Sequence, residues 1–253
     1  MTLLAVERIK LFSTRSPWLC VLLALGLTVG FAGLLSLNAP ADYLTVSATQ
    51  AGYQFGLMVM MVMAALAITT EYRFGTIRAT FQAVPNRTAA LLAKTVLVTV
   101  LAGLIGEIAA FGSWGVATVL QPDVDLALHT EQQWRNVAGV GLVFAFGAVA
   151  SVGVGLLIRH SAGALSVLLL FPMLVEELVQ LIPRVGNDIH DWMPFVNAER
   201  FLTGNPADGS AVSDGMSAMP APPLSPWGSM AYFAAATIAV LVAGLVVANR
   251  RDA

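Results

Sequence analysis

The chain has 253 residues, of which 57% are hydrophobic and only 11% are charged. Soluble domains carry about 25% charged residues, so the composition excludes an ordinary soluble protein and predicts one membrane domain over residues 1–253. The formal net charge of -2 is near neutral, and nothing in the composition points to a nucleic-acid partner.

Six apolar segments predict an all-α fold that crosses the membrane six times. A helix needs about 20 apolar residues to span the hydrocarbon, and each segment is close to that length. The predicted spans are residues 18–37, 51–70, 95–120, 136–158, 161–182 and 227–249.

The segment before the first span, residues 1–17, mixes Glu7, Arg8, Lys10 and Arg15 with apolar residues. This pattern is typical of a helix that lies at the membrane surface, with its cations toward the lipid headgroups. A plain basic flank is the alternative.

Two sets of small residues recur at every fourth position and predict close helix packing. Gly26 and Gly30 form one set in the first span, and Gly147, Ser151 and Gly155 form the other in the fourth. Such spacing also arises by chance in a chain rich in alanine and glycine.

The turn between spans two and three, residues 71–94, is compact and basic. It holds Arg73, Arg78, Arg87 and Lys94. A short basic turn between two spans is expected to stay in the cytoplasm.

Within this turn we expect a short helix. Gly75 and Thr76 mark its start, because a threonine side chain can cap free backbone N–H groups. Pro85 ends it, because the residue before a proline is pushed out of the α region.

The expected helix has two kinds of surface. Ile77, Phe81 and Val84 share an apolar face, whereas Arg78 lies elsewhere on its surface. Glu71, at the end of the second span, is expected to anchor the helix by pairing with Arg73, with Arg78 or with an arginine of a partner.

Glu107 lies near the middle of the third span, where a carboxylate is expensive unless it is paired, protonated or facing a cavity. It is either an acid of a substrate pathway or a buried acid with a structural role. Phe55 and Met58 of the second span are further candidates for lining a pathway. Methionine suits an adaptable surface but more often fills gaps between helices.

The fifth span is interrupted. Pro172 is expected to kink it, and the acids Glu176 and Glu177 follow at once. We expect helical pieces on the outer side over residues 176–202 and an irregular outer loop over residues 203–226.

The charges fit a layout with both termini in the cytoplasm. Ten of the thirteen lysines and arginines fall on the inner side, and only Arg135, Arg184 and Arg200 fall on the outer side. This bias follows the positive-inside rule.

The turn resembles the cytoplasmic loop of the type-2 ATP-binding-cassette (ABC) exporter permeases. The matching residues are Glu71, the run from Gly75 through Thr76 and Ile77 to Arg78, then Pro85 followed by Arg87, and Ala93 with Lys94. Many family members have one more residue between the proline and the arginine. The alternative is a plain positive-inside loop whose arginines only set the topology.

The resemblance implies that the turn contains the coupling helix, which docks on an ATPase subunit. Its coupling residues would be Glu71, Gly75, Thr76, Ile77, Arg78, Phe81, Pro85 and Arg87. The implied partners are two ABC ATPase subunits, a second copy or a homologous permease, and membrane lipid. The implied location is the bacterial plasma membrane.

The chain is expected to have no enzymatic site of its own. It contains no G-x-x-x-x-G-K-[ST] loop, so ATP and Mg²⁺ would be bound by the partner ATPase. Cys20 is the only cysteine and the three histidines are scattered, so no metal site and no intrachain disulfide are expected.

The predicted function is export of an apolar or amphipathic substrate (drug-like, lipid-like or a natural product). Two alternatives stay open. One is an intramembrane protease that uses the carboxyl pair Glu176 and Glu177 as an acid–base site. The other is a membrane immunity or sensor protein without transport activity.

Overall fold

The computed structural model describes residues 3–84, 86–204 and 223–251, and this part of the chain is helical without strands. The first half begins with α1 (Leu3–Phe12), α2 (Arg15–Asn38) and a 3₁₀ turn (Ala41–Tyr43). It continues through α3 (Val46–Thr49), α4 (Tyr53–Phe74), α5 (Thr76–Ala83) and α6 (Arg87–Leu120).

The second half contains α7 (Glu131–Ala138), α8 (Val140–Ile158), α9 (Ser161–Leu170) and the π-helical turn η2 (Phe171–Val175). After it come α10 (Glu176–Val179), α11 (Gly186–His190), α12 (Pro194–Thr203) and α13 (Pro226–Arg251). The predicted outer loop lies mostly outside the described residues.

Six helices are long and apolar enough to cross a membrane, which confirms the predicted number of spans. They cover residues 15–38, 46–74, 87–120, 140–158, 161–179 and 226–250. The chain is therefore built as a multi-pass membrane protein.

Two helices begin elsewhere than the predicted spans. Helix α6 begins at Arg87, well before residue 95, and Lys94 is one of its interior residues, with buried partners. Helix α8 begins at Val140, after residue 136, because the separate helix α7 precedes it.

Helix α8 is the centre of the bundle and packs against α4, α6 and α13. Of its most apolar window 67% is buried within the protein, against 17% for the span of residues 161–179. The fifth span therefore lies at the periphery.

Small residues make the close approach of α8 to its neighbours possible. A Cβ on Gly155 would lie 2.4 Å from Ile68 Cγ2 of α4, and one on Gly153 would lie 2.8 Å from the backbone N of Leu241 in α13. The predicted packing of Gly147 and Gly155 is confirmed. That of Gly26 and Gly30 was wrong, since no atom lies within 4 Å of a Cβ at either position.

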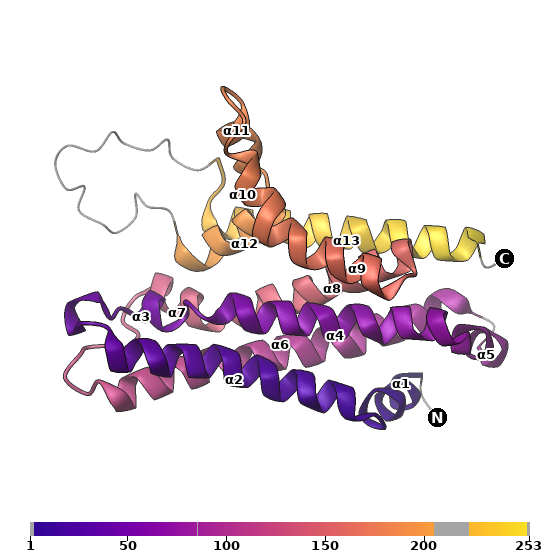
Figure 1. The fold of residues 1–253 in the computed structure, drawn as a ribbon, viewed down its shortest axis with the longest axis horizontal. Coiled ribbons are helices and arrows are strands. Elements are labelled where there is room, and N and C mark those ends of the chain that lie inside the picture. The colour runs from indigo at the N-terminus through magenta and orange to yellow at the C-terminus, as the bar shows by residue number, and fades with distance from the viewer. Residues whose placement is uncertain (1–2, 85, 205–222, 252–253) are drawn as a thin grey trace.

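The short helices lie at opposite ends of the bundle. Figure 1 shows α1, α5 and the C-terminal end of α13 at one end, and α3 and α7 at the other. The beginning and the end of the chain thus lie on the same side as the turn after α4, as expected for six crossings.

The fifth span is irregular where the proline predicts it. Pro172 lies in the π-helical turn η2, since a proline removes one helical hydrogen bond. Beyond it, α10 and α11 project away from the bundle, and α12 returns to lie along α13 (Figure 1). The expected helical pieces after residue 176 are confirmed.

Gly153→Ala should destabilise the bundle, because the added methyl meets the backbone of α13. Overpacking of this kind typically costs about 1–3 kcal/mol. Thermal unfolding in detergent should show a lowered melting temperature. Gly26→Ala is the matched control and should leave it unchanged, and equal effects of the two changes would contradict the assigned packing.

Candidate functional site

The short helix α5 is separated from the second span by a single glycine. Gly75 has φ +72° and ends α4 with its N–H donated to the carbonyl of Tyr72 at 3.3 Å. The same residue is the N-cap of α5. Left-handed backbone is natural for glycine and costly for other residues, so Gly75 allows the chain to turn sharply into α5.

The predicted capping role of Thr76 was wrong. The N-cap of α5 is Gly75, and no side chain caps this helix end. Thr76 is the first helical residue, and its carbonyl accepts a hydrogen bond from the Thr80 hydroxyl at 3.3 Å. Pro85 lies outside the described residues.

Helix α5 turns an apolar face inward and a polar face outward. Ile77 is buried, and Phe81 packs against the hydrophobic core. Arg78 and Gln82 are exposed. Phe74, just before the turn, has 72% of its surface exposed, and the guanidinium of Arg73 lies 5.5 Å from the centre of its ring.

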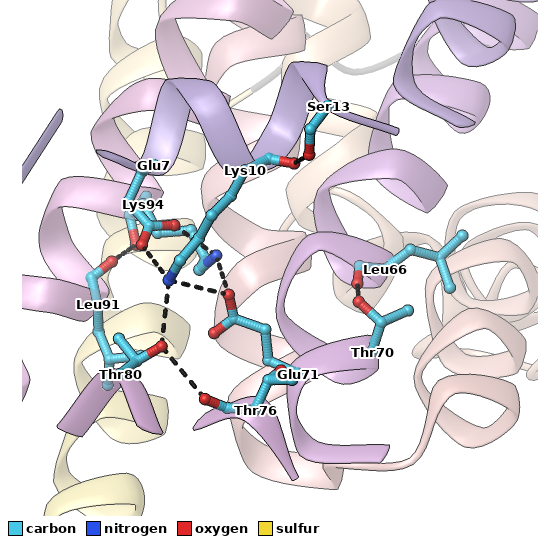
Figure 2. A network of polar contacts seen from close by, with 11 residues as sticks. Glu7, Lys10, Ser13, Leu66, Thr70, Glu71, Thr76, Thr80, Leu91 and Lys94 are labelled. Carbon is cyan, nitrogen blue, oxygen red and sulfur yellow. Dashed lines mark hydrogen bonds and ion pairs between the residues drawn. The ribbon is translucent and has the colours of Figure 1, made fainter. Parts of the chain in front are cut away.

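Four charged side chains from three segments meet behind α5 (Figure 2). We call Glu7, Lys10, Glu71 and Lys94 the charge cluster. Lys94 Nζ lies 2.6 Å from Glu7 Oε2 and 2.8 Å from Glu71 Oε1. Lys10 Nζ lies 2.8 Å from Glu7 Oε1 and 3.6 Å from Glu71 Oε1.

The cluster joins the N-terminal helix to the second and third spans. Glu7 and Lys10 come from α1, Glu71 from the last turns of α4, and Lys94 from α6. Two acids and two bases balance, so the group is neutral as a whole. Its side chains are mostly buried, with only 6% of Glu7 and 8% of Lys94 exposed.

A hydrogen bond connects the cluster to α5. Lys10 Nζ donates to Thr80 Oγ1 at 3.1 Å. Helix α5 is thus linked to α1 by Thr80, to α4 through Gly75, and to α6 through the turn that follows it. A displacement of α5 is therefore transmitted to α1, α4 and α6.

Within the described chain, Glu71 pairs with Lys94 and Lys10 in place of the predicted Arg73 and Arg78, which are exposed. Its predicted pairing with an arginine of a partner stays a prediction. Within the described part of the chain, the second carboxylate oxygen of Glu71 has no hydrogen-bond partner. Arg87 instead places its guanidinium 5.5 Å from the ring centre of Phe81.

The environment favours the charged forms of the two cluster residues that come from α1, Glu7 and Lys10. Burial by itself raises the pKa of Glu7, but Lys94 and Lys10 outweigh it and hold that pKa below its ordinary value. Burial lowers the pKa of Lys10, and Glu7 and Glu71 outweigh this effect, so the pKa of Lys10 lies above its ordinary value.

A crevice of about 960 Å³ opens beside the cluster. It is lined by α1, the start of α2, α4, α5 and α6. Hydroxyl groups and apolar side chains share its walls, so it is an amphipathic space next to the proposed inner face.

The three predicted pathway residues do not form one site. The Phe55 ring packs against Phe31 of α2, with centroids 5.6 Å apart, and Met58 is half-buried on α4. Glu107 lies against Gly141 of α8. The aromatic side chain and the acid thus belong to different helix seams.

The carboxyl pair after the fifth span is divided between two environments. The two oxygens of Glu176 accept hydrogen bonds from the backbone N–H groups of Phe195 and Val196, at 3.1 and 2.9 Å. Glu176 therefore caps the start of α12, whereas Glu177 is exposed and bonds to Gln180. An acid whose oxygens cap a helix is poorly placed for acid–base work.

No family model matches this sequence, and no curated protein matches it either. Among the described residues, no group of three or more His, Cys, Asp or Glu side chains is arranged to hold a metal ion.

Lys94→Met should destabilise the protein strongly, because it leaves Glu7 and Glu71 buried beside a single lysine. Breaking a buried ion pair by removing one partner costs about 3–5 kcal/mol. Thermal unfolding in detergent measures the loss. Arg73→Met is the control, because Arg73 is exposed, and a similar shift for both variants would contradict the assigned role.

Acidification should release α1 from the bundle. Because the pKa of Glu7 is lowered by folding, its contribution is complete above the ordinary carboxyl pKa of about 4.3 and is lost as pH falls through the lowered value. Lys10 has the opposite sign, and its contribution is lost only as pH rises through its raised pKa.

The distance between spin labels at positions 8 and 74, in a Cys20→Ser background, should therefore lengthen below about pH 4. Glu7→Gln should show the longer distance already at neutral pH. An unchanged distance in acid and in this variant would rule out the docking role.

Proposed function

We propose that this chain is the transmembrane subunit of an ATP-driven exporter of the type-2 ABC kind. It would lie in the bacterial plasma membrane, with α1, α5 and the end of α13 on the cytoplasmic side. The observation that carries the proposal is the two-faced helix α5, held between two spans and tied to the charge cluster through Lys10 and Thr80.

The exposed side of α5 is suited to a soluble partner. Phe74 offers a large apolar side chain, and Arg73 and Arg78 supply charge around it. Aromatic residues and arginines are the residue types that most often dominate protein interfaces. An ATPase with an acidic or polar cleft fits this surface.

The proposed mechanism passes from α5 to the spans. When the ATPase pair closes on ATP, it pushes α5, which is joined to α4 through Gly75 and to α6 through the turn before Arg87. The charge cluster carries α1 along with them. The spans then move as a unit and switch the pathway from inward to outward access.

ATP and Mg²⁺ belong to the partner in this scheme, since the sequence has no phosphate-cradling loop of its own. The pathway would form between two permease copies, or between this chain and a similar permease. The second and third spans lie next to α5, so they receive the push directly. The cargo is an apolar or amphipathic molecule.

A photo-crosslinking residue in place of Arg78 should capture a polypeptide that carries a nucleotide-binding loop. In membrane vesicles, Arg78→Glu should lower both the ATPase bound to this chain and the ATP-driven export about tenfold or more, because like charges across an interface cost several kcal/mol. Quantified crosslinking and dye-export rates measure the two effects.

Arg184→Glu is the matched control, since it reverses another exposed arginine in the segment between α10 and α11. It should leave ATPase binding unchanged. Labelling of a cysteine at position 78 by a membrane-impermeant reagent added outside intact cells would contradict the proposal, because it would place α5 on the outer side.

A further inference from the structure

Glu107 lies deep in the membrane-spanning part of α6. At about 1.5 Å per residue, it is roughly 20 Å along the helix from Lys94 of the charge cluster. It is about equally far from Leu120, the last residue of α6. This places it near the middle of the hydrocarbon layer.

The Glu107 carboxyl has no hydrogen bond and no ion pair with any residue that the structure describes. Glu71, Glu176 and Glu177, the other acids in the spans, are all partnered. An ionisable side chain within the membrane is rare and typically serves a function. The absence of a described partner therefore makes Glu107 a candidate for binding a ligand.

The Glu107 carboxyl lies in the space that Gly141 of α8 leaves by having no side chain, which we call the notch. Gly141 of α8 lies directly beside it, and a Cβ there would be 2.4 Å from Glu107 Oε1. The side chain lies flat on the backbone of α8 and is half-buried. Leu104, Ile108 and Leu142 are exposed around it, so the notch opens toward lipid.

Among possible ligands for this carboxyl, an organic cation fits best. A metal ion needs several ligands, and the described residues offer no such group. The surrounding surface is apolar, which strengthens a charge pair by lowering the local dielectric. The ligand must itself partition into lipid, since the notch opens there.

We propose that Glu107 and Gly141 form the head-group site for an amphipath with a protonated amine and an apolar tail. The amine pairs with the Glu107 carboxylate in the notch, and the tail lies over Leu104 and Ile108. This inference rests on the proposed function only in identifying the amphipath as the cargo.

Binding to the full chain in lipid nanodiscs tests the site. The probes are dodecylamine with a fluorophore at the tail end, and the matching dodecanol. Glu107→Gln should weaken amine binding about tenfold or more, the worth of a hydrogen bond to a charged group. It should leave dodecanol binding unchanged. Glu177→Gln, a change of an exposed acid, is the control.

A second variant keeps the test sharp if Glu107→Gln folds poorly. Gly141→Ala fills the notch and displaces the carboxyl, so it should also weaken amine binding selectively. Gly115→Ala on α6 is its control, since no atom lies within 4 Å of a Cβ there. Amine binding as tight as in the unaltered chain, or equal losses for amine and alcohol, overturns the proposal.

The assay uses no ATPase, so the two proposals fail separately. Amine binding that depends on Glu107, in a chain that captures no ATPase at α5, leaves the site standing and removes the exporter. ATP-driven export of amine cargo that is indifferent to Glu107→Gln removes the site and leaves the exporter.

Discussion

The buried lysine between two glutamates is the constraint on which the end of the bundle that carries α1 and α5 depends. Lys94 contacts Glu7 and Glu71 from segments that lie far apart in sequence. Each of these charges would be expensive to bury alone. Together they fix where α1 folds back against the bundle, and therefore how the second and third spans begin and end.

The charge cluster joins α1, α4 and α6 by ion pairs, whereas it joins α5 by a single hydrogen bond. Two charged contacts of 2.8 Å or less, from Lys94 to Glu7 and to Glu71, hold α1, α4 and α6 to one another. Helix α5 is attached to the same group by one neutral acceptor, Thr80, and by its own apolar face. The exposed side of α5 can therefore receive force without unfolding α1, α4 and α6, which the charge cluster holds together.

Hydropathy was enough to predict the six spans, because the length of an apolar run and the cost of burying backbone in lipid leave few choices. It did not predict that the helix of the third span begins as early as Arg87. Lys94 reads as a flank in sequence, and only its distant partner Glu7 makes it an interior residue. A one-dimensional pattern carries no information on such long-range pairing.

Local patterns had mixed success for the same reason. The four-residue spacing of Gly147, Ser151 and Gly155 matches that of Gly26 and Gly30, yet only the glycines of the first set lie against another helix within the described residues. The motif around Gly75 located the short helix correctly. It did not foresee that glycine itself would be the cap, since that depends on the turn out of α4 rather than on the composition of α5.

The glutamates in apolar surroundings show that the local environment of a carboxyl group determines its role. Glu71 is neutralised by lysines, and Glu176 is satisfied by backbone N–H groups at the start of α12. Both therefore contribute to structure. Glu107 has the same carboxyl without a partner among the described residues, and it lies in the space that Gly141 leaves by having no side chain. Lipid supplies no hydrogen bonds of its own in the hydrocarbon layer. The partner of the Glu107 carboxyl must therefore be either a group on a bound ligand or a proton. Binding of an amine distinguishes the two.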